Sequence, residues 1–182
     1  MNGERWLADC LKRFRELKSQ CDRALAQVPF ERWGERLDPD SNSLVTLVLH
    51  LSGNMRSRWT DFLASDGEKP DRDRDAEFED AALDRDALLA RWEDGWSRLF
   101  GALESLTEAD VERTILIRAQ PHTVVEAVNR QLTHYGVHTG QIVLLAKHMA
   151  GPAWNTLSVP RGGTAAFNER MMGMKSGPKP GK

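Results

Sequence analysis

Four long segments of this chain place apolar residues every three or four positions, which is the spacing of one face of an α-helix. The segments cover residues 7–28, 44–64, 84–106 and 123–149. Because each predicted helix is amphipathic, each must bury its apolar face against another element. The sequence therefore predicts an all-α fold, a four-helix bundle with long crossover loops.

Local signals mark where the predicted helices begin and end. Residues that cap helix N-termini stand where the second, third and fourth segments begin: Ser43, Asp84 and Thr123. Thr123 also has Glu126 three positions later, which is a capping-box pattern. Pro29 ends the first segment, and Gly151 follows the last one. These signals predict helices with connections of unequal length.

The remaining segments have weaker patterns. Residues 114–118 are expected to form an extended strand or one arm of a hairpin, and residues 65–83 a solvated charged loop without a chemical role. A short helix is expected around 165–172. We expect one domain over residues 1–170, with an irregular, flexible basic tail over 171–182.

Composition limits the classes of function. Apolar residues make up 40% of the chain and charged residues 29%, which is a globular balance, and the formal net charge is only −2. This charge gives no general attraction to nucleic acid or to membrane surfaces, and no apolar run is long enough to span a bilayer. The expected protein is cytoplasmic. Cys10 and Cys21 lie too far apart on one helix to form a disulfide.

Three histidines are candidate metal ligands. His134 and His138 stand four positions apart on one helical face, so their imidazoles can share one ion. His50 can supply a third ligand if the polar sides of its helix and of theirs face each other. Gly136 and Gly140 are costly inside a helix, by about 1 kcal/mol each, which favours close packing there. If the polar sides face solvent instead, the histidines are ordinary surface residues.

Four further residues are candidate substrate contacts. Asn54 and Gln141 stand one turn beyond His50 and His138, where they can orient water or substrate, although solvated polar groups are equally expected there. Arg58 and Arg161 can hold a carboxylate as planar bidentate donors. A flexible surface turn is the competing interpretation for Arg161.

Two stretches carry a resemblance to a known family. They are LVLHLSGNMRSRWTDFLASDGEKPDRDRDAEFED and QLTHYGVHTGQIVLLAKHMAGPAWNTLSVPRGGTAAFN, which contain one histidine, His50, and later the pattern His-x-x-x-His-x-Gly-Gln from His134 to Gln141. The chain resembles a subfamily of the DinB/YfiT-like proteins. The resemblance implies a four-helix bundle, a homodimer, and a site for zinc, nickel or a similar ion at His50, His134 and His138.

The family suggests several activities, which leaves the function open between three alternatives. The first is an enzyme that transfers a low-molecular-weight thiol, such as bacillithiol, to a small electrophilic substrate. The second is a metal-dependent hydrolase. No glutamate follows His134 in the His-Glu-x-x-His manner, which favours thiol transfer. The third alternative is a non-catalytic protein that binds a metal or ligand under stress.

Overall fold

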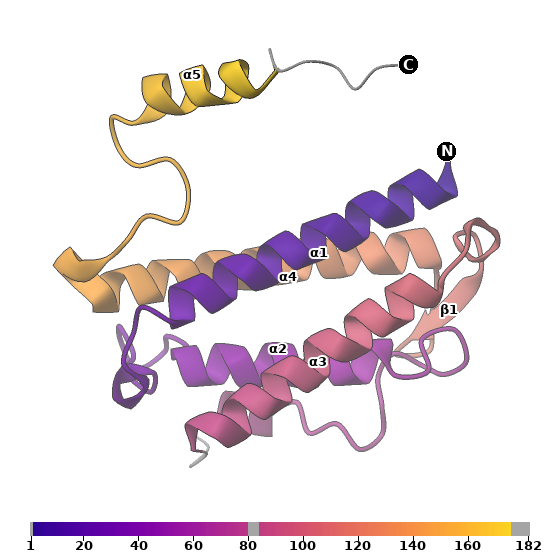
Figure 1. Ribbon diagram of the computed structural model, residues 1–182. Coiled ribbons are helices and arrows are strands. Elements are labelled where there is room, and N and C mark those ends of the chain that lie inside the picture. The colour runs from indigo at the N-terminus through magenta and orange to yellow at the C-terminus, as the bar shows by residue number, and fades with distance from the viewer. Residues whose placement is uncertain (1, 80–83, 176–182) are drawn as a thin grey trace.

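The computed structural model describes residues 2–79 and 84–175 of the chain and is mainly helical (Figure 1). Its long helices are α1 (Gly3–Leu25), α2 (Leu44–Trp59), α3 (Arg85–Ser105) and α4 (Val124–Ala150). The shorter elements are η1 (Phe30–Arg32), η2 (Ala76–Phe78), η3 (Glu108–Asp110), β1 (Thr114–Ile117), β2 (Gln120–Thr123), η4 (Gly151–Ala153) and α5 (Thr164–Lys175). The prediction of an all-α class is confirmed, with a small hairpin added.

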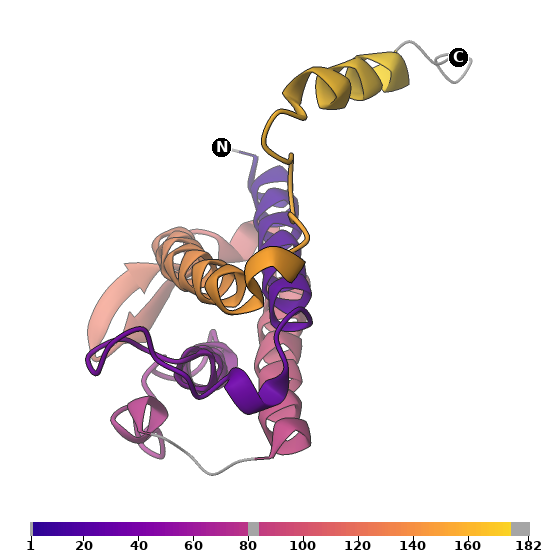
Figure 2. The ribbon, with the colours of Figure 1, turned by 90° about the vertical axis from the view of Figure 1, so that its left-hand side faces the viewer.

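The four long helices surround one hydrophobic core. α1 packs along α4, and α2 packs along α3, while α2 also contacts α4. Figures 1 and 2 show the α1–α4 pair lying against the α2–α3 pair. The largest fully buried side chains come from all four helices and include Phe14, Met55, Trp92, Trp96 and Tyr135. The amphipathic faces predicted from spacing thus meet in this core.

The predicted N-caps are confirmed. The Ser43 hydroxyl accepts a hydrogen bond from the backbone N–H of Thr46, and the Asp84 carboxylate accepts one from Ala87. Thr123 and Glu126 form the full capping box at the start of α4. Each cap satisfies backbone donors that the first helical turn leaves without partners. These local signals therefore fix where α2, α3 and α4 begin.

Helix α2 ends at Trp59, earlier than the predicted end at residue 64. Asp61 has a φ of 49°, a left-handed conformation that stops the helix. The chain then folds back on the last turn, where the side chains of Ser57 and Arg58 both donate to the backbone carbonyl of Gly67. Tertiary contacts with the following loop, which helical spacing does not reveal, set this boundary.

The loop after α2 is not the fully solvated segment that its charge predicted. The side chains of Arg72 and Glu77 are only 5% and 9% exposed. They remain charged in the interior because they pair with each other, as buried charges must. The prediction that residues 65–83 are all solvated is therefore wrong for these two positions, whereas residues 80–83 lie outside the described part of the chain.

The segment before α4 is a hairpin, as one of the two sequence interpretations expected. β1 pairs with β2 in antiparallel register, Thr114 opposite Thr123. Its turn residues, Arg118 and Ala119, have positive φ values of 54° and 59°. The Asp66 carboxylate accepts hydrogen bonds from both of their backbone N–H groups, at 2.8 and 2.7 Å. This contact anchors the hairpin to the loop after α2.

The C-terminal segment contains the expected short helix. α5 stands away from the four long helices in both views (Figures 1 and 2). It continues through residue 175, so the first five residues of the segment expected as an irregular tail, 171–182, are helical, and residues 176–182 lie outside the described part. In the described residues, no helix is both long and apolar enough to cross a membrane.

Candidate metal centre

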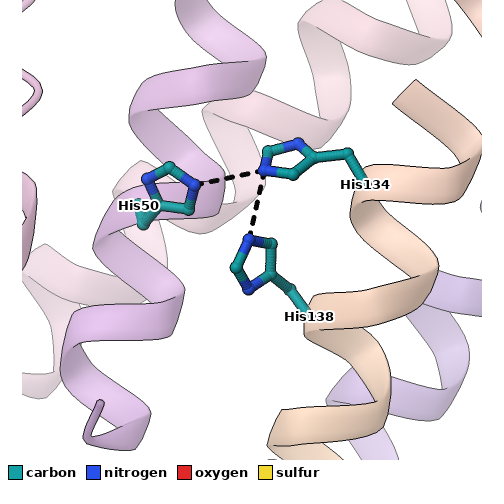
Figure 3. Close-up of side chains that lie close together, drawn as sticks. All are labelled: His50, His134 and His138. Carbon is teal, nitrogen blue, oxygen red and sulfur yellow. Dashed lines mark hydrogen bonds between the residues drawn. The ribbon is translucent and has the colours of Figure 1, made fainter. Parts of the chain in front are cut away.

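The three predicted histidines converge between α2 and α4 (Figure 3). The Nε2 atom of His134 lies 3.2 Å from Nε2 of His50 and 3.1 Å from Nε2 of His138. One ligand nitrogen from each ring lies within 4.8 Å of the other two. Ring nitrogens this close repel each other unless a proton or a cation lies between them, and three neutral imidazoles are a donor set that divalent ions accept. The group can therefore hold a metal ion.

The packing of α2 against α4 brings these residues together. The backbone N–H of Val45, at the start of α2, donates to the carbonyl of Trp33, and the neighbouring Arg32 donates to the carbonyl of Met149, near the end of α4. The N-terminal end of α2 therefore lies beside the C-terminal end of α4. One helical turn beyond His50 on α2, Oδ1 of Asn54 accepts a hydrogen bond from the Tyr135 hydroxyl at 3.0 Å. This buried hydrogen bond fixes the antiparallel register in which the two polar sides face each other.

A buried carboxylate holds the outer nitrogen of His50. Nδ1 of His50 lies 2.9 Å from Oε2 of Glu77, and since a carboxylate only accepts, Nδ1–H is the donor. This tautomer leaves the lone pair of Nε2 facing the other two histidines. Many metal-binding histidines have such a carboxylate partner, which orients the ring and raises its basicity.

Arg72 in turn fixes Glu77. Its Nε and Nη2 atoms donate to Oε1 and Oε2 of Glu77, both at 2.8 Å, in a bidentate pair. Burial opposes ionisation of Glu77, but the hydrogen bonds from Arg72 and His50 outweigh it and lower the pKa of the carboxyl group. Glu77 is therefore a carboxylate at neutral pH, as its role toward His50 requires.

Gly53 leaves the space that Glu77 occupies. A Cβ atom at this position of α2 would lie 2.1 Å from Oε1 of Glu77, well inside van der Waals contact. Any other residue would push the carboxylate away from His50, which lies one turn earlier on the same helix. The ring of Phe78 covers His50, with ring centroids 4.6 Å apart.

The two histidines of α4 are also prepared for binding. Nδ1–H of His138 donates to Oε1 of Gln141 at 2.7 Å, which again turns Nε2 toward the cluster. Burial, followed by the charges of His138 and His50, lowers the pKa of His134 from 6.5 to about 3. Burial also lowers the pKa of His138. Both rings are therefore neutral at pH 7, the state that binds metal.

The four residues predicted to contact substrate lie in different surroundings. Gln141 contacts His138, while Asn54 is buried against Tyr135 and Arg58 is buried against the loop after α2. Arg161 is exposed in the turn before α5, and in the described residues no hydrogen bond or ion pair joins it to the histidines. Substrate contact at these four positions stays a prediction.

The close packing inferred from Gly136 and Gly140 is wrong within the described chain. A Cβ atom built at either glycine meets nothing within 4 Å. These glycines therefore do not make room for another segment of the described chain, and the structure gives no reason for their presence. The metal site rests on the histidines and their partners alone.

A sizeable cleft near the site does not contain the histidines. It has a volume of about 760 Å³ and lies between α2, α3 and the loop after α2. Arg72, Glu77 and Gly53 line it, but His50, His134 and His138 do not. The pair that holds His50 thus separates the histidine cluster from this cleft.

Sequence reasoning missed Gly53, Arg72 and Glu77. In the sequence, Arg72 and Glu77 stand among many charged residues, and nothing distinguishes them from solvated neighbours. The sequence separation of 27 positions from His50 to Glu77 gives no periodic spacing that could link them. The contact depends on how the loop folds back onto α2, and only the structure shows this.

A comparison with protein-family models places the chain. A family described as a protein of unknown function, DUF1572, matches residues 1–163. The chain belongs to the DUF1572 family. The match contains all three histidines with Glu77 and Arg72, and it ends just before α5 begins. A search of curated proteins found no match. The description of DUF1572 names no activity, so the function must be argued from the site.

Proposed function

We propose that this DUF1572 protein is a metal-dependent enzyme with a DinB/YfiT-like four-helix bundle, which binds one zinc or nickel ion through His50, His134 and His138. The observation that carries the proposal is the convergence of three Nε2 atoms within 4.8 Å. The arrangement of α1 to α4 around one core supports the bundle. Surface histidines would not need the oriented partners that His50 and His138 have.

The donor set suits a catalytic site better than a structural one. Structural zinc sites use four protein ligands, whereas catalytic sites use three and leave one position open. In the described residues, the group that can hold a metal contains three histidines only. When bound, a divalent ion supplies Lewis acidity that lowers the pKa of a thiol or a water in the open position.

We propose transfer of a low-molecular-weight thiol to a small electrophile as the reaction. Glu77 contacts His50 on the ring nitrogen that faces away from the cluster, and it is already bound by Arg72. It therefore does not serve as a general base for water beside the open position. A thiol loses its proton far more readily than water does. Thiol transfer therefore depends less than hydrolysis on a general base at this site.

The reaction can be tested with a thiol and a fluorogenic electrophile. Zinc- or nickel-loaded wild type would be mixed with monochlorobimane and cysteine, bacillithiol or mycothiol in turn, beside a His134→Ala variant. We expect at least one thiol to react faster with wild type than with the variant. If the protein accelerates the reaction of no thiol with monochlorobimane but hydrolyses para-nitrophenyl acetate, it is a hydrolase. If neither reaction is accelerated, the enzyme proposal is wrong.

A further inference from the structure

Arg58 has an unused hydrogen-bonding edge inside the protein. The residue is 5% exposed, and both of its hydrogen bonds come from Nη1, to the carbonyl of Gly67 and to Glu68. Its Nε atom is buried without a partner in the described part of the chain. The Nε–Nη2 edge of a guanidinium is one that binds a carboxylate with two parallel hydrogen bonds. A buried donor without a partner is costly, so this edge calls for a ligand.

A second buried polar group without a partner lies on α4, in the stretch that precedes the histidines. Oε1 of Gln131 has no hydrogen-bond partner among the described residues, and the residue is only 4% exposed. On α2, Arg58 lies one turn beyond Asn54, which accepts the hydrogen bond of Tyr135, and on α4, Gln131 lies one turn before Tyr135. Gln131 precedes His134 by one turn. The two unpartnered groups thus lie on the two helices that carry the histidines.

The charge of Arg58 is only partly balanced. Among the described residues its carboxylate partner is Glu68, which also binds Arg72 at 3.3 Å and Arg118 at 3.0 Å. Burial lowers the pKa of Arg58, but a guanidinium stays protonated at neutral pH. Its positive charge reaches the cluster, where it helps, after burial and the two other histidines, to lower the pKa of His134.

We infer that Arg58, together with Gln131, binds the carboxylate of a ligand whose other end occupies the three-histidine site. The inference rests on the proposed metal function and names the substrate class for it: small molecules that carry a carboxylate a few bonds from the metal-binding atom. Arg58 supplies the bidentate edge. The Gln131 amide can turn to present its N–H₂ group to the same oxyanion.

Thiols with and without a carboxylate test this inference directly. Cobalt-loaded full-length protein would be titrated with mercaptoacetate and mercaptopropionate, and with mercaptoethanol and mercaptopropanol as neutral partners. Binding is followed by the visible absorption of the cobalt ion. In wild type we expect the carboxylates to bind about 10- to 100-fold more tightly, the range for a charge-assisted bidentate contact.

Three variants assign the preference to its residues. Arg58→Lys keeps the charge but loses the bidentate edge, so the preference should fall to within about threefold of equal binding. Gln131→Met keeps the volume and should reduce it partly, which provides a test if Arg58→Lys does not fold. Arg56→Gln removes the neighbouring exposed arginine, which pairs with Asp71, and should leave the preference unchanged.

The outcomes separate this inference from the metal proposal. Cobalt binding with equal affinity for both kinds of thiol overturns the carboxylate subsite alone and means that water satisfies the unused edge. A preference that survives in both Arg58→Lys and Gln131→Met also overturns it. No cobalt spectrum in wild type overturns the metal site, and with it the substrate class inferred here.

Discussion

The two ring nitrogens of His50 have different partners, and this difference prepares the side chain as a ligand. Nδ1 donates to Glu77, and Nε2 faces His134. Arg72 keeps Glu77 ionised and fixed in place. His138 repeats the arrangement with Gln141. At the scale of single residues, the site is thus defined by hydrogen bonds that set the tautomers as well as by three imidazoles.

Replacing Glu77 should weaken metal binding. Glu77→Gln keeps the shape of the side chain but removes the charged acceptor that holds Nδ1–H of His50, so we expect the zinc affinity to fall about 10- to 100-fold. Competition with a fluorescent chelator measures this, with thermal unfolding as the check that the variant is folded. Glu79→Gln, at an exposed neighbouring position, is the control. Equal affinities in Glu77→Gln and Glu79→Gln would contradict the role of Glu77.

His134 should make the metal-free protein less stable in acid. Burial, with the neighbouring histidines, lowers its pKa from 6.5 to about 3, so the unfolded chain binds the proton more readily than the folded one. The contribution of His134 to folding is therefore complete above about pH 6.5 and is lost as the pH falls toward 3. Urea unfolding between pH 7.5 and pH 4.5 should show a larger loss of stability in wild type than in His134→Gln. Parallel curves would exclude this contribution.

Helix α2 is the element that supports the site. His50 on this helix faces α4, while Gly53 on the next turn admits Glu77 from the following loop. The end of α2 at Trp59 matters because the loop must turn back early to bring Arg72 and Glu77 over the helix. A helix that continued to residue 64, as the spacing predicted, would leave less loop to reach His50.

A methyl group at Gly53 should disrupt this support. Gly53→Ala places a Cβ atom against Oε1 of Glu77, so we expect the free energy of unfolding to fall by about 1–3 kcal/mol and metal binding to weaken. Gly101→Ala on α3 is the matched control. Its added Cβ meets nothing within 4 Å, so this helical substitution should raise stability by up to about 1 kcal/mol. Chemical denaturation of both variants measures the difference, and a stabilising Gly53→Ala would refute the close contact.

Helical spacing and capping signals predicted α1 to α4 and the pairing of His134 with His138, because these depend on residues close in sequence, whereas His50 as the third ligand was implied by the resemblance to the DinB/YfiT-like proteins. The capping box of Thr123 and Glu126, for example, spans only four positions of the sequence. The partners of the histidines could not be predicted. The Glu77–His50 contact depends on the path of a charged loop, which composition alone describes as solvated. The hairpin turn has Arg118 and Ala119 where a glycine is usual. Hydrogen bonds from their backbone N–H groups to the Asp66 carboxylate, far away in the sequence, hold this turn in place.

At the scale of the whole molecule, the candidate site joins two helix pairs. α4 packs mainly on α1, and α2 mainly on α3, while the histidines lie where α2 meets α4. An ion held by His50 and His134 would therefore stabilise the assembly of all four helices. By contrast, α5 stands away from them (Figure 2), and the DUF1572 match ends before it.

Removal of α5 should leave the site intact. A chain that ends at Gly163 keeps α1 to α4 and every residue of the cluster, so we expect its free energy of unfolding to stay within about 0.5 kcal/mol of the full-length value. Its metal content should also be unchanged. Urea denaturation and metal analysis, side by side with the full chain, check both expectations. A large loss of stability would mean that α5 packs on the body in solution.

The metal content of purified protein tests the central claim most directly. Protein without a histidine tag would be analysed by plasma mass spectrometry as wild type, His50→Ala and His134→Ala, with His148→Ala as a control outside the cluster. We predict about one equivalent of a divalent metal in wild type and in His148→Ala, and almost none in the other two variants. Wild type that holds no metal, even after incubation with zinc or nickel, would contradict the proposal.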